Sequence, residues 1–341
     1  MGRTGPLRWS GGATVRVLVT GATSLVGSAV VNLLRDRGDS VTVLQRRPSE
    51  LDVTEHLGDI ANRTAVTAAI TGVDAVVHVA GRAAATGEWA LFEDTNVLGT
   101  RNVIDAARDA GVTRIVHVSS PSVAHSGQSL VGAPAGPADP EHARGHYARS
   151  KAQAELISLG ASSVSMSVVA IRPHLIWGPG DTQLVGRIVD RAKSGRLAIV
   201  GSGASLIDTI YIDNAAEALV AALDRAPELG GRAFVVTNGQ PRPVREVLNR
   251  IVMAAGVDRP RVKVPYRVAH TGGLVVDRVW EHRKIESDPP MTSFLAEQLG
   301  TAHWFDQRET RRALEWRPRI SLDEGFRRLE TWFQGEVEAR P

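Results

Sequence analysis

Short apolar runs alternate with longer amphipathic segments over the first half of the chain. Runs rich in Val, Ile and Leu that are bounded by Gly, Asp or Ser are typical of strands buried on both faces of a sheet. The segments between them are rich in Ala, and the segment 25–38 ends on a glycine, as helices often do. This alternation predicts βαβ units and an α/β fold with a Rossmann-type, doubly wound parallel sheet. We expect strands at 15–20, 40–45, 53–59, 74–81 and 113–120, and helices at 25–38, 62–72 and 92–110.

A long segment without periodicity follows the fifth predicted strand. Residues 121–143 are rich in Gly, Pro and Ala, and a loop of this length inside a compact domain usually has a function. Helical spacing returns at 143–159, and an apolar run at 163–173 predicts another strand. The loop and the helix after it are therefore the first places to look for a site.

The pattern beyond Pro173 is less regular and predicts a smaller, mostly helical C-terminal lobe. Short helices are expected there at 184–194, 214–224, 244–255 and 322–333, and the segment 208–237 is expected to return to the sheet. The predicted division is a flexible leader at 1–13, a cofactor-binding Rossmann domain at 14–172 completed by 205–238, and a substrate-binding lobe at 173–204 and 239–341.

Composition excludes several classes of function. Forty Lys and Arg nearly balance 37 Asp and Glu, and no block of five like charges occurs, so a nucleic-acid groove is not indicated. The chain has no cysteine, which excludes disulfides and thiolate metal sites and fits a reducing cytoplasm, and we expect no metal. No stretch approaches the ~20 apolar residues of a membrane span, so we expect no transmembrane segment.

The turn after the first predicted strand reads "TGATSLVG" and carries Gly21 and Gly27. Gly21 permits a tight turn, and Gly27 lets the following helix press against the strand. Backbone N–H groups at the start of that helix would then suit a pyrophosphate. Read by itself, one glycine-rich turn is also compatible with a plain strand–helix connection.

The second predicted strand ends on Gln45, followed by Arg46 and Arg47. In dinucleotide-binding folds this place usually has an acidic residue that bonds the ribose 2′-hydroxyl. A carboxylate would repel a 2′-phosphate, whereas a guanidinium binds it with two hydrogen bonds. The two arginines therefore predict NADP(H) rather than NAD(H), although both are also compatible with merely solvated side chains.

Two more strand ends agree with a dinucleotide site, because ligands bind at the carboxyl ends of such strands. "GDI", residues 58–60, offers an acid that could meet the adenine amino group. "HVAG", residues 78–81, ends in small residues that would let a cofactor lie flat. Each of these segments alone could be only a strand end.

Tyr147 and Lys151 lie four residues apart in "YARSK", on one face of the helix predicted at 143–159. The spacing alone is common, but the pair follows directly on the long loop, and Ser120 ends the preceding strand. These three side chains are the candidates for proton transfer.

Taken together these motifs resemble the extended short-chain dehydrogenase/reductase family. "TGATSLVG", "GDI", "HVAG", "NVLGTRNV", "VSSPSV", "YARSK" and "RPHLIWGPGD" occur in the family's order, over about residues 15–333. One departure is Ser24, where the family's turn usually has a glycine. The resemblance implies an NADP(H)-dependent oxidoreductase, with cofactor contacts from Gly21, Thr23, Ser24, Leu25, Val26, Gly27, Arg46, Arg47, Asp59, Ile60, Val79, Ala80, Gly81, Asn96, Tyr147, Lys151 and Pro173.

The family's chemistry, carried over to this chain, makes Tyr147 the proton donor to a ketone or the acceptor from an alcohol. A free phenol has a pKa near ~10, and the Lys151 ammonium and the nicotinamide cation are expected to lower it. Ser120 would hydrogen-bond the same substrate oxygen, and Lys151 would also reach the nicotinamide ribose. Asn96, carried over as a cofactor-side residue, is equally compatible with helix packing or capping.

The segment after the sixth predicted strand separates branches of the family. Sugar-nucleotide enzymes typically read "RPxNVYGP", whereas this chain reads "RPHLIWGP", with Leu175 in place of the asparagine and Trp177 in place of the tyrosine. Dehydratases place Asp-Glu after the catalytic hydroxyl, where this chain has Pro121 and Ser122. "SSPSV", "RPHLIWGPGD" and "DPPMTSFLAEQL" are instead similar to the 3β-hydroxysteroid dehydrogenase-like branch, which includes sterol-4-carboxylate 3-dehydrogenases and bacterial 2-alkyl-3-oxoalkanoate reductases of long-chain olefin biosynthesis.

The second of these activities is the closer resemblance, and it implies NADPH-dependent reduction of a lipid-like 2-alkyl-3-oxoalkanoic acid to the 2-alkyl-3-hydroxy acid. The alternative is a 3β-hydroxysteroid or sterol dehydrogenase; a sugar-nucleotide epimerase or dehydratase, or a non-catalytic dinucleotide-binding regulator, ranks below both. Arg82, His174 and Trp177 are candidate substrate contacts, with Arg144 and Arg149 as further carboxylate partners. His174 is equally compatible with a hydrogen-bonded loop residue, and Trp177 with a core residue. Residues 268–299 would form a lipid-entry lid or an ordinary helical lobe. The family also implies a homodimer and an association with other olefin-pathway enzymes.

Overall fold

The computed structural model describes residues 14–84, 86–124, 127–283, 289 and 291–338. The leader predicted at 1–13 and part of the segment 268–299 lie outside the described residues. Within these ranges no helix is long and apolar enough to cross a bilayer.

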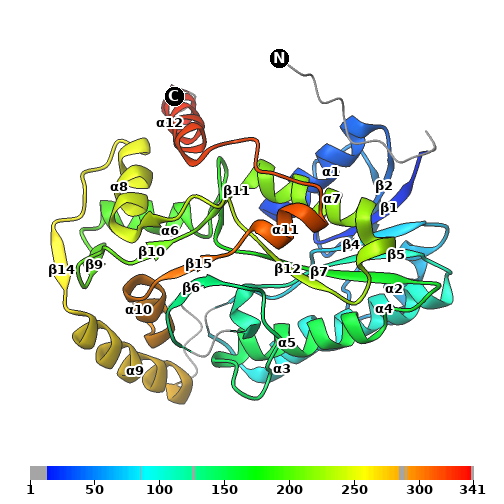
Figure 1. The fold of residues 1–341 in the computed structure, drawn as a ribbon, viewed down its shortest axis with the longest axis horizontal. Helices are drawn as coiled ribbons and strands as arrows, with labels where there is room; N and C mark the ends of the chain where they lie inside the picture. The colour runs from blue at the N-terminus through cyan, green and yellow to red at the C-terminus, as the bar shows by residue number, and fades with distance from the viewer. Residues whose placement is uncertain (1–13, 85, 125–126, 284–288, 290, 339–341) are drawn as a thin grey trace.

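A seven-stranded sheet forms the centre of the molecule, with strand order β12-β7-β5-β4-β1-β2-β3 and parallel pairing throughout (Figure 1). The order reverses between β4 and β1, which is the place where open α/β sheets bind ligands. The doubly wound parallel sheet predicted from the sequence is confirmed. Its strands are β1 (Arg16–Thr20), β2 (Ser40–Gln45), β3 (Thr54–Leu57), β4 (Ala75–His78), β5 (Arg114–Val118), β7 (Ser167–Pro173) and β12 (Ala233–Val236).

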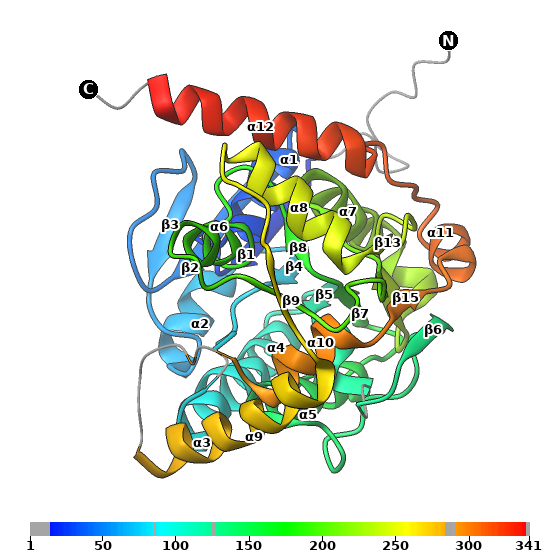
Figure 2. The ribbon, with the colours of Figure 1, turned by 90° about the vertical axis from the view of Figure 1, so that its left-hand side faces the viewer.

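Helices cover both faces of this sheet (Figure 2). Because strand side chains alternate, Val17 and Val19 of β1 pack on the face of α1 and α7, while Leu18 packs on the face of α2 and α4. Both clusters are closed to water, so the strands read as continuous apolar runs. The covering helices are α1 (Leu25–Arg37), α2 (Arg63–Ile70), α3 (Trp89–Phe92), a π-helical turn (Glu93–Leu98), α4 (Gly99–Asp109), α5 (Gly145–Gly160) and α7 (Ile212–Leu229).

Smaller sheets and further helices make up the C-terminal part, and β12 returns to the central sheet as expected for the segment 208–237. The strands there are β8 (Ile176–Trp177), β9 (Ala198–Val200), β10 (Leu206–Ile207), β11 (Ile210–Tyr211), β13 (Arg242–Pro243), β14 (Val262–Val264) and β15 (His303–Phe305). The helices are α6 (Val185–Lys193), α8 (Val244–Ala254), α9 (Tyr266–Arg283), α10 (Ser293–Gly300), α11 (Arg308–Ala313) and α12 (Leu322–Glu338). The residue bounds of a separate substrate-binding lobe stay a prediction.

The segment 121–143, predicted as a loop, contains ordered structure. A short 3-10 turn (Pro121–Ala124) opens it, and β6 (Leu130–Ala133) pairs with β15 in the sheet β13-β10-β15-β6. The buried Arg172 of β7 donates hydrogen bonds to the carbonyls of Ala135 and Gly136. The loop next to Ser120 is therefore anchored to the C-terminal part of the chain and to the central sheet.

Candidate active site

Two positions in the turn between β1 and α1, Gly21 and Gly27, have no room for any residue larger than glycine. Gly21 has a φ of +74°, and a Cβ atom there would lie 2.8 Å from the backbone N and Cα of Ala80. A Cβ at Gly27 would lie 2.3 Å from the carbonyl oxygen of Gly21. The turn, the end of β4 and the first turn of α1 thus enclose a narrow backbone cradle.

Ser24, the departure from the usual glycine, begins α1 as its N-cap. Its hydroxyl accepts a hydrogen bond from the N–H of Gly27 at 3.1 Å and donates to the carbonyl of Gly21 at 2.8 Å. The backbone of Ser24 is extended, so glycine is not needed there. Thr23 beside it is exposed, and Leu25 and Val26 open the helix, where N–H groups lack helical partners.

Segments far apart in the sequence converge at Gly81, just after β4. A Cβ at Gly81 would come within 3.2 Å of Oδ1 of Asn96 and 3.8 Å of Nζ of Lys151. Val79 and Ala80 before it are half-buried, and the Ala80 N–H donates to the hydroxyl of Thr20 at 3.1 Å. Gly81 thus packs closely against Asn96 and Lys151, and a side chain larger than hydrogen would crowd this contact between the end of β4 and α5.

Asn96 lies in the π-helical turn and ties three elements together. Its amide donates to Ser150 of α5 at 2.8 Å and exchanges two hydrogen bonds with the backbone of Arg82. Asn96 is 1% exposed and both of its polar atoms are occupied by protein groups. It positions the Gly81 segment against α5, as the packing alternative predicted.

Tyr147 and Ser120 lie next to each other across the gap between α5 and the end of β5. A hydrogen bond joins their side chains, and Ser120 is also 2.9 Å from the hydroxyl of Ser122. Burial raises the pKa of Tyr147 above its ordinary value, and the Ser120 hydrogen bond opposes this rise. Among the protein's own groups the expected lowering by Lys151 is therefore absent, and the phenol holds its proton at neutral pH, as a general acid must.

Lys151 is 5% exposed and donates to the carbonyl of Val118 at 2.6 Å. Burial lowers the pKa of its ammonium to about 8, and Glu155 one turn further along α5 works in the opposite direction. Lys151 is thus held at the end of β5, on the side of Gly81.

We expect the burial of Lys151 to be visible in the pH dependence of stability. Because its pKa is lower in the folded chain than in the unfolded chain, the unfolded state binds more protons between pH 8 and 10.5, and stability rises with pH in that window. The rise is at most about 1.4 kcal/mol for each pH unit. Urea unfolding of the wild type and of Lys151→Met at pH 7, 8.5 and 10 measures this rise. The free energy of unfolding of the wild type should increase relative to that of the variant from pH 8.5 upwards. If the free energies of unfolding of the two proteins changed equally with pH, the lowered pKa of Lys151 would be contradicted.

Two buried histidines below Lys151 escaped the sequence analysis. His78 and His117 are neighbours in the register of β4 and β5, with ring centroids 5.4 Å apart. Burial and the Lys151 ammonium lower the pKa of both, that of His78 to about 3, so both rings are neutral. His78 bonds Thr20 at 2.7 Å and Thr100 at 3.0 Å. The available signal was a histidine at the same place in two apolar strands, "AVVHVAG" and "RIVHVSS".

Arg46 and Arg47 follow β2 as exposed side chains, and within the described ranges neither has an ion-pair partner. Gln45, which stands in the usual place of the acid, is buried and turned toward Glu55 of β3, to which its amide donates. Both guanidinium groups are therefore available to an anion at this strand end.

The other predicted cofactor residues lie at the same edge of the sheet. Asp59 accepts a hydrogen bond from the N–H of Ala61 at 2.9 Å in the turn after β3. Ile60 is buried against Gly99, where a Cβ would lie 2.6 Å from its side chain, and Pro173 ends β7. The structure thus gathers the glycine turn, Arg46 and Arg47, the segment 79–81, and Ser120, Tyr147 and Lys151 at the carboxyl ends of the strands.

The three candidate substrate residues fall in different environments. Trp177 is fully buried: it stacks on Phe326 at 4.5 Å and donates its indole N–H to Thr209, which leaves no indole surface for a ligand. Its prediction as a substrate contact is corrected to a core residue. His174 is buried beside Phe305 and bonds the carbonyl of Asp208 at 2.7 Å.

Arg82 differs from the other candidate carboxylate partners. It follows Gly81 directly, is half-buried, lies over the ring of Phe92 at 5.3 Å, and forms no ion pair with any described carboxylate. Arg144 instead pairs with the buried Glu297, and the exposed Arg149 lies over Trp89 at 4.8 Å. Among the described carboxylates neither Arg82 nor Arg149 has an ion-pair partner, and Arg82 is the one of the two that directly follows Gly81.

Leu175 adopts a left-handed backbone conformation with a φ of +50°. Asparagine enters this region readily, whereas a bulky apolar residue does so at a cost. The asparagine typical of sugar-nucleotide enzymes would be relaxed here, whereas the leucine adopts this conformation at a cost.

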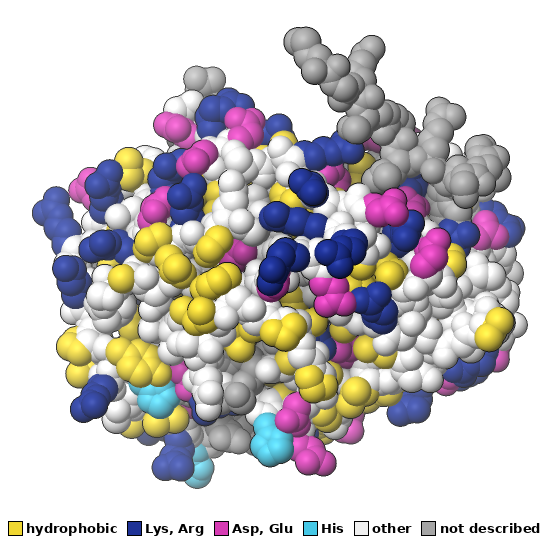
Figure 3. Space-filling view, in the orientation of Figure 1, with side chains coloured by type: hydrophobic (Ala, Val, Ile, Leu, Met, Phe, Trp, Pro, Cys, Tyr) yellow, Lys and Arg dark blue, Asp and Glu magenta, His cyan; other side chains and the backbone are white. Residues whose placement is uncertain are grey.

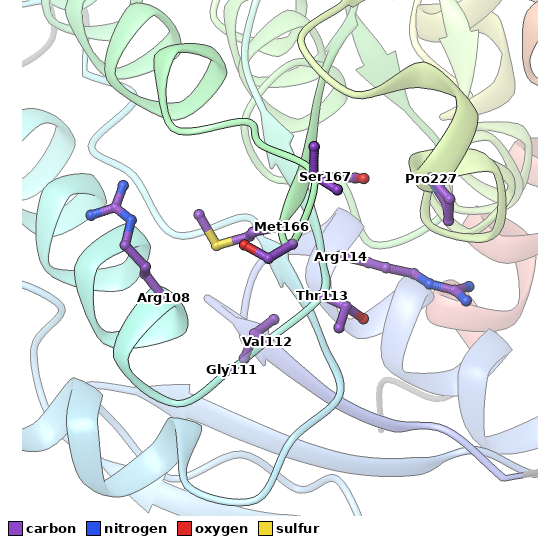
Figure 4. A pocket seen from close by; sticks show the side chains of 10 residues that line it. Arg108, Gly111, Val112, Thr113, Arg114, Met166, Ser167 and Pro227 are labelled. Atoms are coloured by element: carbon purple, nitrogen blue, oxygen red, sulfur yellow. The ribbon is translucent and has the colours of Figure 1, made fainter.

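A surface hollow on the described part of the chain lies away from this site. Residues 111–114 and 164–167 line it with Arg108 and Pro227, at the amino ends of β5 and β7 (Figure 4). It is thus on the opposite edge of the sheet from Tyr147. No cluster of His, Asp and Glu suited to a metal ion occurs among the described residues.

A dinucleotide cradle, an adjoining tyrosine–serine pair and a buried lysine define a NAD(P)-dependent oxidoreductase of the Rossmann fold. The model of the NAD dependent epimerase/dehydratase family matches residues 17–237, and the chain belongs to this family of extended short-chain dehydrogenases/reductases.

Relatives agree with this class, and solved structures agree with the fold. A 2-alkyl-3-oxoalkanoate reductase of Stenotrophomonas maltophilia is 40% identical over 93% of this chain and 98% of its own length. The human sterol-4-alpha-carboxylate 3-dehydrogenase, decarboxylating, is 30% identical over 94% of this chain and 88% of its own. The crystal structure of gox2253 matches with a TM-score of 0.76 and 25% identity over 95% of this chain and 99% of that one. MoeE5 in complex with UDP-glucose and NAD, at 22% identity, covers 94% of this chain and 99% of its own with a TM-score of 0.72, and shows the fold alone.

Proposed function

We propose that the chain reduces the 3-oxo group of a 2-alkyl-3-oxoalkanoic acid to a hydroxyl group with NADPH. The observation that carries the reaction type is the pairing of Tyr147 with Ser120 at the end of β5, with the buried Lys151 one turn further along α5 and in contact with Gly81. The bound dinucleotide supplies a hydride to the carbonyl carbon. The Tyr147 hydroxyl gives its proton to the carbonyl oxygen, and Ser120 holds that oxygen by a second hydrogen bond.

NADPH rather than NADH is supported by the end of β2. Arg46 and Arg47 are exposed, without an ionic partner among the described residues, and Gln45 takes the place of the acid that would repel a 2′-phosphate. The glycine cradle at Gly21 and the first turn of α1 suit the pyrophosphate.

An alkyl keto acid is supported by two features of the chain. Leu175 stands where sugar-nucleotide enzymes typically have an asparagine that contacts the diphosphate, and its side chain packs against the core, which speaks against a sugar diphosphate. Arg82, next to Gly81, would take the substrate carboxylate. The relatives named 2-alkyl-3-oxoalkanoate reductase from Stenotrophomonas maltophilia and Shewanella oneidensis, 40% and 35% identical, support the same substrate class.

The second candidate is a sterol or 3β-hydroxysteroid dehydrogenase. The human sterol dehydrogenase is 30% identical over nearly the whole chain, and its substrate also has a carboxylate beside the reacting carbon. The same residues would serve in the oxidative direction, in which Tyr147 must be ionised before it can accept the proton of an alcohol. From the resemblance we also propose a cytoplasmic homodimer that associates with other olefin-pathway enzymes, and a substrate-binding lobe at 173–204 and 239–341.

A substrate panel tests the proposal. We expect NADPH fluorescence to fall on addition of 2-alkyl-3-oxo acids, with NADH at least about tenfold less effective at equal concentration. Oxidation of a 3β-hydroxysteroid, with no β-keto acid reduced, would instead establish the sterol activity. A panel with neither reaction, in protein that still binds NADPH, would overturn both.

A further inference from the structure

The solvent-facing side of α9 carries an apolar stripe. Val268, Val275 and Val279 lie on one side of the helix, and Val268 and Val275 are 60% and 61% exposed. Leu274 is 52% exposed but lies about 120° around the helix from Val268, outside this stripe. Isolated exposed valines need no explanation, but a run of large apolar residues along one helix marks a contact surface.

Basic side chains border this stripe. At 100° per residue, Arg267 and Arg278 fall on one side of the valines and Arg283 falls on the other, and all three are exposed. Asp277 is the acidic residue of α9 whose side chain the structure describes, and it is turned toward α10, where it bonds Ser293. Figure 3 shows apolar, basic and histidine side chains together at the lower left, over α9.

α9 is coupled to the catalytic helix through α10. A Cβ at Gly273 would lie 2.4 Å from the backbone of Ser293, so the two helices touch along their backbones. His270 of α9 is 3.0 Å from the buried Glu297 of α10, and the same carboxylate accepts a hydrogen bond from Arg144 at the start of α5. α5 carries Tyr147, so the apolar face belongs to the part of the molecule that adjoins the site.

We propose that α9 docks on the surface of an anionic lipid bilayer, with Val268, Val275 and Val279 in the interfacial region and the arginines on the headgroups. An amphipathic helix with apolar residues between basic ones is the pattern that lies in a membrane surface. Docking would let a lipid-like keto acid pass from the bilayer to the active site. This role in substrate delivery rests on the proposed function, whereas the docking itself does not.

The charge of the rim favours a bilayer over a second copy of the chain. A two-fold contact through α9 would bring the same face onto itself and set the arginines of both copies against each other. Anionic headgroups offer the opposite charge to the rim and apolar chains to the valines.

Vesicle flotation without substrate or cofactor tests the docking. The wild type should float with phosphatidylglycerol vesicles and not with phosphatidylcholine vesicles, and 0.5 M salt should weaken binding. Val268→Ser, Val275→Ser and Val279→Ser together should lower partitioning at least about tenfold, and Arg267→Gln with Arg278→Gln should lower it by a similar factor. The matched control is Val131→Ser with Val164→Ser, two exposed valines on other elements, which should bind as the wild type does.

A single-cysteine probe gives a second readout that does not depend on the multiple variant. Because the chain has no cysteine, Val275→Cys carries a unique environment-sensitive fluorophore, and its emission should shift to the blue with phosphatidylglycerol vesicles. The same label at Val164→Cys should show no shift.

Three results would overturn the docking: no flotation of the wild type, no shift at position 275, or a dimer that the valine substitutions dissociate while vesicles stay unbound. Reduction of a short, water-soluble 2-alkyl-3-oxo acid by the same variants keeps the two proposals apart. If the protein binds vesicles but does not reduce the short keto acid, the proposed substrate is wrong. If it reduces the keto acid but does not bind vesicles, only the docking proposal is wrong.

Discussion

Tyr147→Phe is expected to reduce keto-acid turnover by about 10³-fold or more while leaving NADPH affinity within about twofold. The substitution removes one oxygen and keeps the ring, so the packing around α5 is preserved. Ser120 still bonds the substrate oxygen, but no group at that place holds a proton for it, because Lys151 donates to the carbonyl of Val118. Single-turnover absorbance of NADPH separates this loss of proton transfer from a loss of cofactor binding.

Tyr211→Phe is the matched control. Tyr211 is buried against Trp177, and its hydroxyl interacts with Arg328 of α12, away from the site. This variant should retain activity within about twofold. Turnover by Tyr147→Phe at the rate of the control would show that the phenol is not the proton donor.

Arg46→Ala combined with Arg47→Ala should raise the Kd of NADPH about 100-fold and that of NADH less than about threefold. The two nucleotides differ only in the 2′-phosphate, and a charged hydrogen bond is worth about 1.5–3 kcal/mol, less at an exposed strand end. The substitutions should therefore weaken the binding free energy of NADPH and leave that of NADH almost unchanged. Titration of nicotinamide fluorescence at 0.1 M salt measures both constants.

Arg101→Ala with Arg317→Ala provides the charge-matched control, since both side chains are exposed on other elements. It removes the same net charge and should leave both constants unchanged. An equal loss for NADH and NADPH in Arg46→Ala with Arg47→Ala would mean that the arginines act on a part common to the two nucleotides, and NADP(H) specificity would have to be withdrawn.

The parts of the fold that local spacing determines were predictable. Buried strands of the central sheet are apolar on both faces, and the turn at Gly21 and the pair Tyr147 and Lys151 are each read within a few residues. Their convergence follows from the parallel sheet, because the carboxyl ends of all its strands share one edge.

Pairings between distant short segments were not predictable. β6 has neither the length nor the alternation of a strand, and it forms because β15, from the far end of the chain, supplies its partner. The sequence could not decide between a pocket and the core for Trp177, because an aromatic residue after a strand looks the same in both places. The raised pKa of Tyr147 depends on its burial, which no spacing reports.

The pairing of β6 with β15 affects the order in which parts of the chain can fold during synthesis. The central sheet needs nothing beyond β12, so it can assemble while the last third of the polypeptide is still being synthesised. The segment after Ser120 must wait for residues 303–305 before it finds its neighbour. A nascent chain can therefore form the nucleotide-binding turn before the segment after Ser120 is in place. The catalytic site is then completed last.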